Sequence, residues 1–129
     1  MEKVKIRLEA KDIDLPGYDD KDDMGIDLRA NDDCEIKSQC SAVIKTGVFA
    51  QIPKNCIGLV GDRLGITSKY GVYCLPLTIN SMSSDETIVL LFNAGKESFY
   101  IEKGMRVGQL FILPAMKSEI ELVSSKKDK

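Results

Sequence analysis

Short segments in which apolar and polar residues alternate cover most of the chain. In residues 4–8, Val4, Ile6 and Leu8 alternate with charged side chains, and a period of two is that of a half-buried strand. We expect further strands at 25–30, 34–37, 41–45, 47–52, 56–60, 73–80, 86–92, 98–102, 106–113 and 118–123. Only 63–70 is a candidate helix, and a short one. The pattern predicts an all-β chain folded as an antiparallel barrel or a jelly roll.

The segment Met-Gly-Ile-Asp-Leu-Arg-Ala at 24–30 is typical of a glycine turn that leads into a strand. Gly25 is expected to supply a backbone conformation that other residues reach only with strain. Ile26 and Leu28 then point to one face, and Asp27 and Arg29 point to the other. An acid at the head of a strand can be held rigidly at a cleft. An acid after a glycine is more often a solvated turn residue, so a functional role for Asp27 depends on the rest of the chain.

Composition limits the classes of protein. With 129 residues and 43% hydrophobic content, we expect a single domain over 1–123 and a polar, disordered tail at 124–129. A net charge of −2 argues against a nucleic-acid-binding protein, which normally has a basic excess. The sequence shows neither a long apolar run nor the apolar core of a signal peptide. It therefore predicts no membrane association and a cytoplasmic or nuclear location.

The chemistry available to the chain is restricted by its residue types. It has four cysteines without a CxxC pair and no histidine, which excludes a Cys/His zinc site and favours reduced cysteines. Without histidine, catalysis would rest on carboxylates, lysine or a bound metal. The acidic run at 19–23 is interpreted as a solvated loop, with a cation site or repulsion of anionic ligands as alternatives.

The order and spacing of several segments resemble the trimeric dUTPase family over roughly residues 4–123. The matching segments are MGIDLRA at 24–30, TGVFAQIPKNCIGLVGDR at 46–63, RLGI at 63–66 with KYGV at 69–72, IN at 79–80, IVLLFNAG at 88–95 and KGMRVGQL at 103–110. The resemblance implies a distorted jelly-roll homotrimer with three sites at subunit interfaces. It also implies water attack on the α-phosphate of dUTP, giving dUMP and pyrophosphate, with Mg²⁺ bound to the triphosphate.

Part of the family's site is present in this chain. The resemblance implies that Asp27 lies near the metal and its waters, and it assigns nucleotide or phosphate contacts to six positions: Asp27, Arg63, Gly65, Asn80, Arg106 and Gln109. No residue is assigned as a protein ligand to a metal.

Other family residues are replaced. Leu64 stands in place of a phosphate-contacting serine, Asn80 in place of the catalytic aspartate, and Ser83 in place of the tyrosine under the deoxyribose. An amide cannot accept the proton of the attacking water at neutral pH. Met105 replaces an acid, and the chain ends at Lys129 before the glycine-rich fifth motif. Whether that arm is naturally absent or has been removed stays open.

These replacements suggest a hypothesis and two alternatives. The first is a dUTPase-fold protein that has lost dUTP hydrolysis and acts as a binding or regulatory module, with no cofactor and with an unidentified protein partner. The second is a divergent active dUTP diphosphatase that uses Asp27, Mg²⁺, Arg63 and Gln109, with Asp85 as the base. The third is a pocket that binds a nucleotide weakly without cleaving it. Viruses commonly carry this family, so a viral source is also open.

Overall fold

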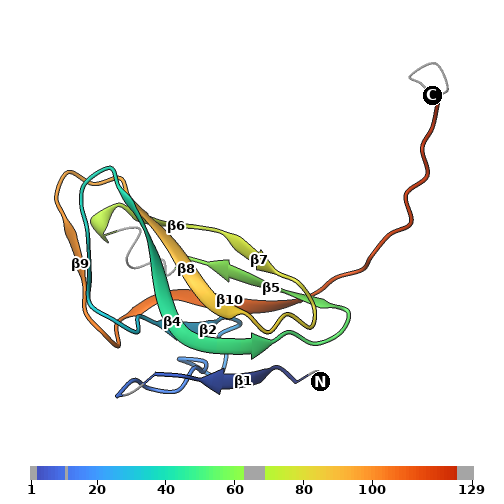
Figure 1. Cartoon of the computed structure of the whole chain (residues 1–129), viewed down its shortest axis with the longest axis horizontal. Coiled ribbons are helices and arrows are strands. Elements are labelled where there is room, and N and C mark those ends of the chain that lie inside the picture. The colour runs from blue at the N-terminus through green and yellow to red at the C-terminus, as the bar shows by residue number, and fades with distance from the viewer. Residues whose placement is uncertain (1–2, 11, 63–68, 125–129) are drawn as a thin grey trace.

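A computed structural model describes residues 3–10, 12–62 and 69–124. These residues form an all-β fold, as the alternating pattern predicts (Figure 1). The strands are β1 (Lys5–Leu8), β2 (Ile26–Arg29), β3 (Cys34–Ile36), β4 (Ser41–Gln51), β5 (Cys56–Gly61), β6 (Val72–Leu75), β7 (Leu77–Ile79), β8 (Glu86–Asn93), β9 (Phe99–Ile101) and β10 (Arg106–Pro114).

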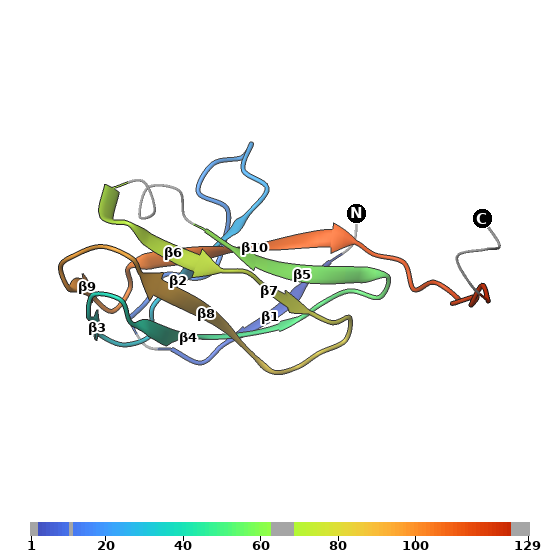
Figure 2. The ribbon, with the colours of Figure 1, turned by 90° about the horizontal axis from the view of Figure 1, so that it is seen from above.

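Two four-stranded antiparallel sheets enclose the core. One has the order β1-β4-β8-β6 and the other β2-β10-β5-β7, while β3 and β9 form a separate pair. Figure 2 shows β5 and β10 in one layer and β4 and β8 in the other. Residues from both sheets, among them Leu28, Val60, Val89, Leu91 and Leu110, are almost fully buried in one cluster. Buried positions alternate with partly exposed ones along β5 and β8, so each of these strands turns its buried face toward this cluster.

The predicted strands agree with the structure except at three places. The segments 41–45 and 47–52 join into β4, which has a register shift between Lys45 and Val48. Gly47 lies within that shift with a φ of 69°, a conformation that favours glycine. The segment 73–80 divides into β6 and β7 at Pro76, which lacks the N–H that a continuous ladder needs.

The third difference is the segment 118–123, for which the prediction of a strand is wrong. Residues 115–124, here called the C-terminal arm, leave the end of β10 and run away from the body without joining a sheet (Figure 1). Alternation alone cannot make a strand, because the backbone groups of a strand need a neighbour with which to pair. The helix predicted at 63–70 and the tail predicted at 124–129 fall largely on 63–68 and 125–129, which lie outside the described residues.

Asn93 joins the two-stranded pair to the main body. Its side chain is fully buried; the amide donates to the carbonyls of Ile36 and Glu97, both at 2.8 Å, and its oxygen accepts from the backbone N–H of Gly95 at 2.9 Å. In the sequence, Asn93 stood out only as part of the matching segment 88–95. The structure shows that a satisfied buried amide holds the ends of β3 and β8 and the following loop together.

The four cysteines are free thiols. Cys74 is buried, and burial together with the nearby Asp62 carboxylate raises the pKa of its thiol to about 11, so the thiol stays neutral. In the part of the chain that the structure describes, no helix has the length and apolar character to cross a membrane.

Candidate functional site

A β-bulge in β10 sets which side chains share a face with Asp27. Arg106 lies opposite Arg29, and Gln109 lies opposite Asp27, with a register shift between Arg106 and Gly108. Without a bulge, residues three apart on a strand point to opposite faces. The extra residue reverses that relation, so Arg106 and Gln109 both lie on the face of Asp27 and Arg29. The opposite face carries Val107 and Leu110, which are buried in the core.

Asp27 is a buried acid and not a solvated turn residue. It is only 5% exposed, although it points away from the core residues on either side of it. Its backbone N–H donates to the carbonyl of Gly17 at 2.8 Å, and its carboxylate accepts from Arg106 Nη1 at 3.4 Å. A carboxylate buried to this degree is normally paired, and Arg106 supplies the partner charge.

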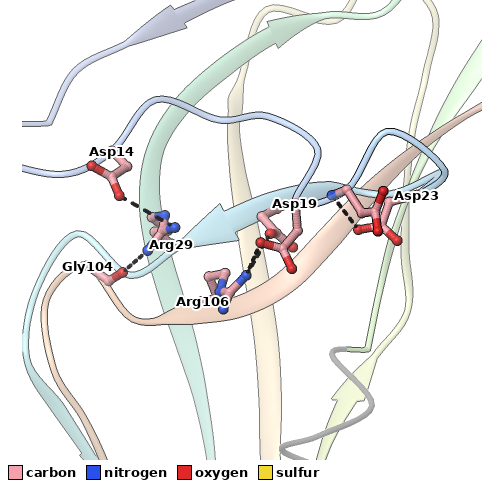
Figure 3. Close-up of polar contacts among 8 residues, drawn as sticks. Asp14, Asp19, Asp23, Arg29, Gly104 and Arg106 are labelled. Atoms are coloured by element: carbon pink, nitrogen blue, oxygen red, sulfur yellow. Dashed lines mark hydrogen bonds and ion pairs between the residues drawn. The ribbon is translucent and has the colours of Figure 1, made fainter.

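Arg106 also contacts a second carboxylate, that of Asp19 (Figure 3). Nη1 of Arg106 lies 2.7 Å from Asp19 Oδ1. Slight burial lowers the pKa of Arg106, but the carboxylates of Asp19 and Asp27 outweigh this and raise it above its usual value. The acidic run at 19–23 is therefore only partly a solvated loop, because its first residue forms an ion pair. Sequence reasoning did not single out Asp19, and no local pattern indicates its partner.

Gly25 is required for a reason that differs from the one expected. Among the described glycines, those with positive φ are Gly47, Gly71 and Gly104, so Gly25 does not have the special conformation predicted for it. A Cβ at Gly25 would instead lie 2.9 Å from Cδ of Gln109 and 3.0 Å from Cε1 of Phe111. Gly25 therefore lets the Gln109 side chain lie directly against the start of β2.

We expect Gly25→Ala to displace Gln109 and to lower the free energy of unfolding by about 1–3 kcal/mol, the usual cost of overpacking. The matched control is Gly17→Ala, because a Cβ at Gly17 meets no atom within 4 Å. Urea denaturation at a fixed protein concentration measures both variants. Equal stability of the two variants would contradict the steric role of Gly25.

A second group of predicted site residues lines a cavity between β5, β7 and β8, here called the hairpin cavity. Its volume is about 320 Å³, within the range of small-molecule sites. Asn80, Ser83 and Asp85 all line it; the other lining residues are Val60, Leu77, Thr78, Ile79, Glu86, Thr87 and Ile88. The lining combines apolar side chains with polar ones, and Asn80, Ser83 and Asp85 are here called its polar rim. Of the two acids in the lining, Glu86 accepts a hydrogen bond from the backbone N–H of Gly47 at 2.9 Å, while Asp85 is exposed.

The turn at 80–83 positions the rim of the hairpin cavity. The N–H of Ser83 donates to the carbonyl of Asn80 at 3.2 Å, the hydroxyl of Ser81 donates to the carbonyl of Cys56, and Met82 has a φ of 63°. Asp85 follows this turn with an exposed side chain, while its backbone N–H donates to Ser83 Oγ at 3.4 Å. The carboxylate of Asp85 is thus presented at the mouth of the cavity.

Asp27, Arg106 and Gln109, here called the Asp27 group, lie apart from the hairpin cavity within one chain. Asp27 pairs with Gln109, which pairs with Gly61 on β5, whereas Ile79, just before Asn80, pairs with Gly58. Along the sheet order β2-β10-β5-β7, this places Asp27 and Asn80 roughly 13 Å apart along the strands and roughly 14 Å apart across them. One chain does not bring both groups to a single phosphoryl centre.

Three of the predicted site positions, Arg63, Leu64 and Gly65, lie outside the described residues. Met105, which the resemblance placed at an acidic position, is partly buried against the core. Its carbonyl accepts from the backbone N–H of Ala30 at 2.9 Å, so its observed role is in packing.

Comparison with solved structures identifies the fold class. The dUTPase of Staphylococcus bacteriophage 80alpha, solved with dUpNHpp, is 24% identical with a TM-score of 0.90, covering 97% of this chain and 98% of that one. The dUTPase of phage phi11 of S. aureus, whose structure addresses a structural Mg(II) ion, is 22% identical with a TM-score of 0.88, covering 98% and 99%. The fold is therefore the jelly-roll-like fold of these dUTPases, as expected from the sequence.

Comparison of sequences identifies the family. A family model described as dUTPase matches residues 11–129. The deoxyuridine 5′-triphosphate nucleotidohydrolase of Rhizobium etli is 36% identical over 119 residues, covering 88% of this chain and 76% of that protein. The enzyme of the same name from Clostridium tetani is 36% identical over 122 residues, covering 93% and 84%. The chain belongs to the dUTPase family.

The hypothesis that this protein has lost dUTP hydrolysis is wrong as the main interpretation. The curated relatives that match most of the chain are named as dUTP nucleotidohydrolases, and they favour the alternative of an active enzyme. The replacements at Leu64, Asn80 and Ser83 do not by themselves show a loss of activity. The hairpin cavity still holds a carboxylate, Asp85, beside Asn80.

Proposed function

We propose that the protein hydrolyses dUTP to dUMP and pyrophosphate with the assistance of Mg²⁺. The observation that carries this proposal is the 36% identity, over most of the chain, to relatives named as dUTP nucleotidohydrolases. The geometry adds support, because a cavity lined by Asn80 and Asp85 and an arginine flanked by carboxylates are both present. The four free thiols fit a reducing compartment such as the cytoplasm or nucleus.

We assign the base to Asp85 and the sugar contact to Asn80. Asp85 is exposed at the mouth of the hairpin cavity, where its carboxylate can orient and deprotonate a water molecule. Asn80 keeps an amide that can hydrogen-bond the 3′-hydroxyl of the deoxyribose. The short side chain of Ser83 leaves room in the cavity where the family carries a ring.

Arg106 and Gln109 act on the phosphates in this proposal. Both lie on the face of Asp27 because of the bulge in β10, and their N–H groups can stabilise negative charge as it develops on the phosphate oxygens. Arg63, the third phosphate contact expected from the resemblance, belongs to the same proposal. Asp27 keeps Arg106 in place through the 3.4 Å contact.

Mg²⁺ fits the donors present at this site. Among the described residues, no group of three or more His, Cys, Asp or Glu side chains could hold a metal ion. Mg²⁺ does not require such a cage, because it is commonly held by one or two carboxylates together with substrate phosphates. Asp27 is the residue that would hold it or its waters, and the ion would neutralise charge on the triphosphate.

A homotrimer would bring the two halves of the site together. Asp27 and Asn80 are too far apart within one chain to meet at one phosphate, so the hairpin cavity of one subunit would face the Asp27 group of a neighbour. The C-terminal arm also needs a partner: Ile120 and Leu122 are 85% and 90% exposed. Burial of these side chains against another subunit would remove a large apolar area from water.

The activity is tested by pyrophosphate release from dUTP in the presence of Mg²⁺. We expect turnover by the wild-type protein and a decrease in kcat of about 10²–10⁴-fold in Asp85→Asn, the usual contribution of a general base. Asp32→Asn is the matched control, because Asp32 is an exposed acid outside both groups. Absence of turnover by the wild-type protein would contradict the proposed function, and a fully active Asp85→Asn would contradict only the assignment of the base.

The trimer is tested by light scattering. We expect a mass about three times the 14.3 kDa of one chain, and we expect the double variant Ile120→Glu/Leu122→Glu to dissociate because its charged side chains cannot be buried without partners. Ser118→Glu, a change on the same arm at a polar position, is the control. A wild-type mass of one chain would rule out the trimer, and an intact double variant would rule out the role of the arm.

A further inference from the structure

Arg106 lies between two carboxylates that differ in how firmly they are held. Nη1 is 2.7 Å from Asp19 and 3.4 Å from Asp27. The Asp27 side chain is 6% exposed and belongs to β2, whereas the Asp19 side chain is 55% exposed and belongs to a loop. The shorter contact is thus made by the more accessible acid.

The loop that carries Asp19 is anchored at its base by a bridge, and hydrogen bonds between its own residues stabilise its turn. At the base, Gly17 and Asp27 form an isolated antiparallel bridge. Within the loop, the backbone N–H of Asp20 donates to Asp23 Oδ2 at 3.0 Å, and that of Asp23 donates to the carbonyl of Asp20 at 3.0 Å. The turn at 20–23 can therefore keep its own hydrogen bonds while the loop moves about its base.

We propose that Asp19 is a positioning residue that occupies the phosphate-binding position of Arg106 until an anion replaces it. The carboxylate of Asp19 and a phosphate oxygen are both anionic acceptors for the same N–H group, so they compete for Arg106. Asp27 stays in place during the exchange, because its burial makes removal of its partner costly. The proposal rests on the phosphate-binding role given to Arg106 in the proposed function.

The change in anion affinity on removal of the Asp19–Arg106 ion pair can be estimated. An exposed ion pair such as Asp19–Arg106 contributes modestly and is weakened by salt. Its removal should therefore tighten the binding of an anion by about two- to five-fold at low ionic strength. The same removal should slightly destabilise the protein without ligand. Opposite changes in affinity and stability distinguish competition from a purely structural role, since loss of structure alone would weaken both.

The experiment is calorimetric titration of the full chain with inorganic pyrophosphate in the presence of a chelator, so that no metal contributes. We expect Asp19→Asn to bind pyrophosphate about two- to five-fold more tightly than the wild-type protein and to have a slightly lower Tm without pyrophosphate. Asp19→Glu should restore the wild-type affinity. The matched control is Asp22→Asn, which removes the same charge from the same loop at an exposed position and reports the general electrostatic effect.

The gain in pyrophosphate affinity of Asp19→Asn should also depend on Arg106 and on the salt concentration. Combining Asp19→Asn with Arg106→Gln should abolish the gain, and high salt should decrease it. If this double variant does not fold, a larger gain in Asp19→Asn than in Asp22→Asn shows that the effect is local to the contact with Arg106. Equal affinities of Asp19→Asn and Asp22→Asn, or no binding by either at millimolar pyrophosphate, would overturn the proposal. Because this titration needs no turnover, a protein that fails to hydrolyse dUTP can still support or refute the role of Asp19.

Discussion

The bulge in β10 determines which side chains surround Asp27. It places one residue more on β10 than on β2 between the pairs Arg106–Arg29 and Gly108–Leu28. Arg106 and Gln109 then share a face, while Val107 and Leu110 remain in the core. A regular strand would have to bury one of the two polar side chains or expose one of the two apolar ones. The bulge therefore lets the same strand supply both a core and a site.

The buried acid adjacent to this bulge organises its surroundings through charge. Asp27 is almost fully buried, so Arg106 must remain close to it, and the ion pair in turn holds Arg106 where Asp19 or an anionic ligand can reach it. The Asp27 group and the hairpin cavity are separated because β2 and β7 are the opposite edges of one sheet. In the proposed function, the acids, the amide and the guanidinium act together on one substrate when two chains meet.

The fold could be predicted well from the sequence, and the site only in part. Alternation of apolar and polar residues in short segments predicts most of the strands. It does not show whether a segment has a neighbouring strand to pair with, and for that reason the prediction at 118–123 is wrong. The roles of Gly25 and Asn93 could not be predicted, because both depend on contacts between segments distant in the sequence. The structure brings Asn80, Ser83 and Asp85 to one cavity. Their chemical roles stay a prediction, because a role depends on where the substrate lies in the cavity and not on residue type alone.

In the proposed function, the hairpin cavity of one subunit and the Asp27 group of another form one site for dUTP hydrolysis. The most direct measurement is complementation between two inactive variants, Asp27→Asn and Asp85→Asn, whose subunits are mixed and allowed to exchange. If the two halves come from different subunits, some sites in the mixture contain both native halves, and the activity should recover to about a quarter of that of the wild-type protein. If each site lies within one chain, the mixture would remain as inactive as either variant alone, and a site shared between subunits would be ruled out.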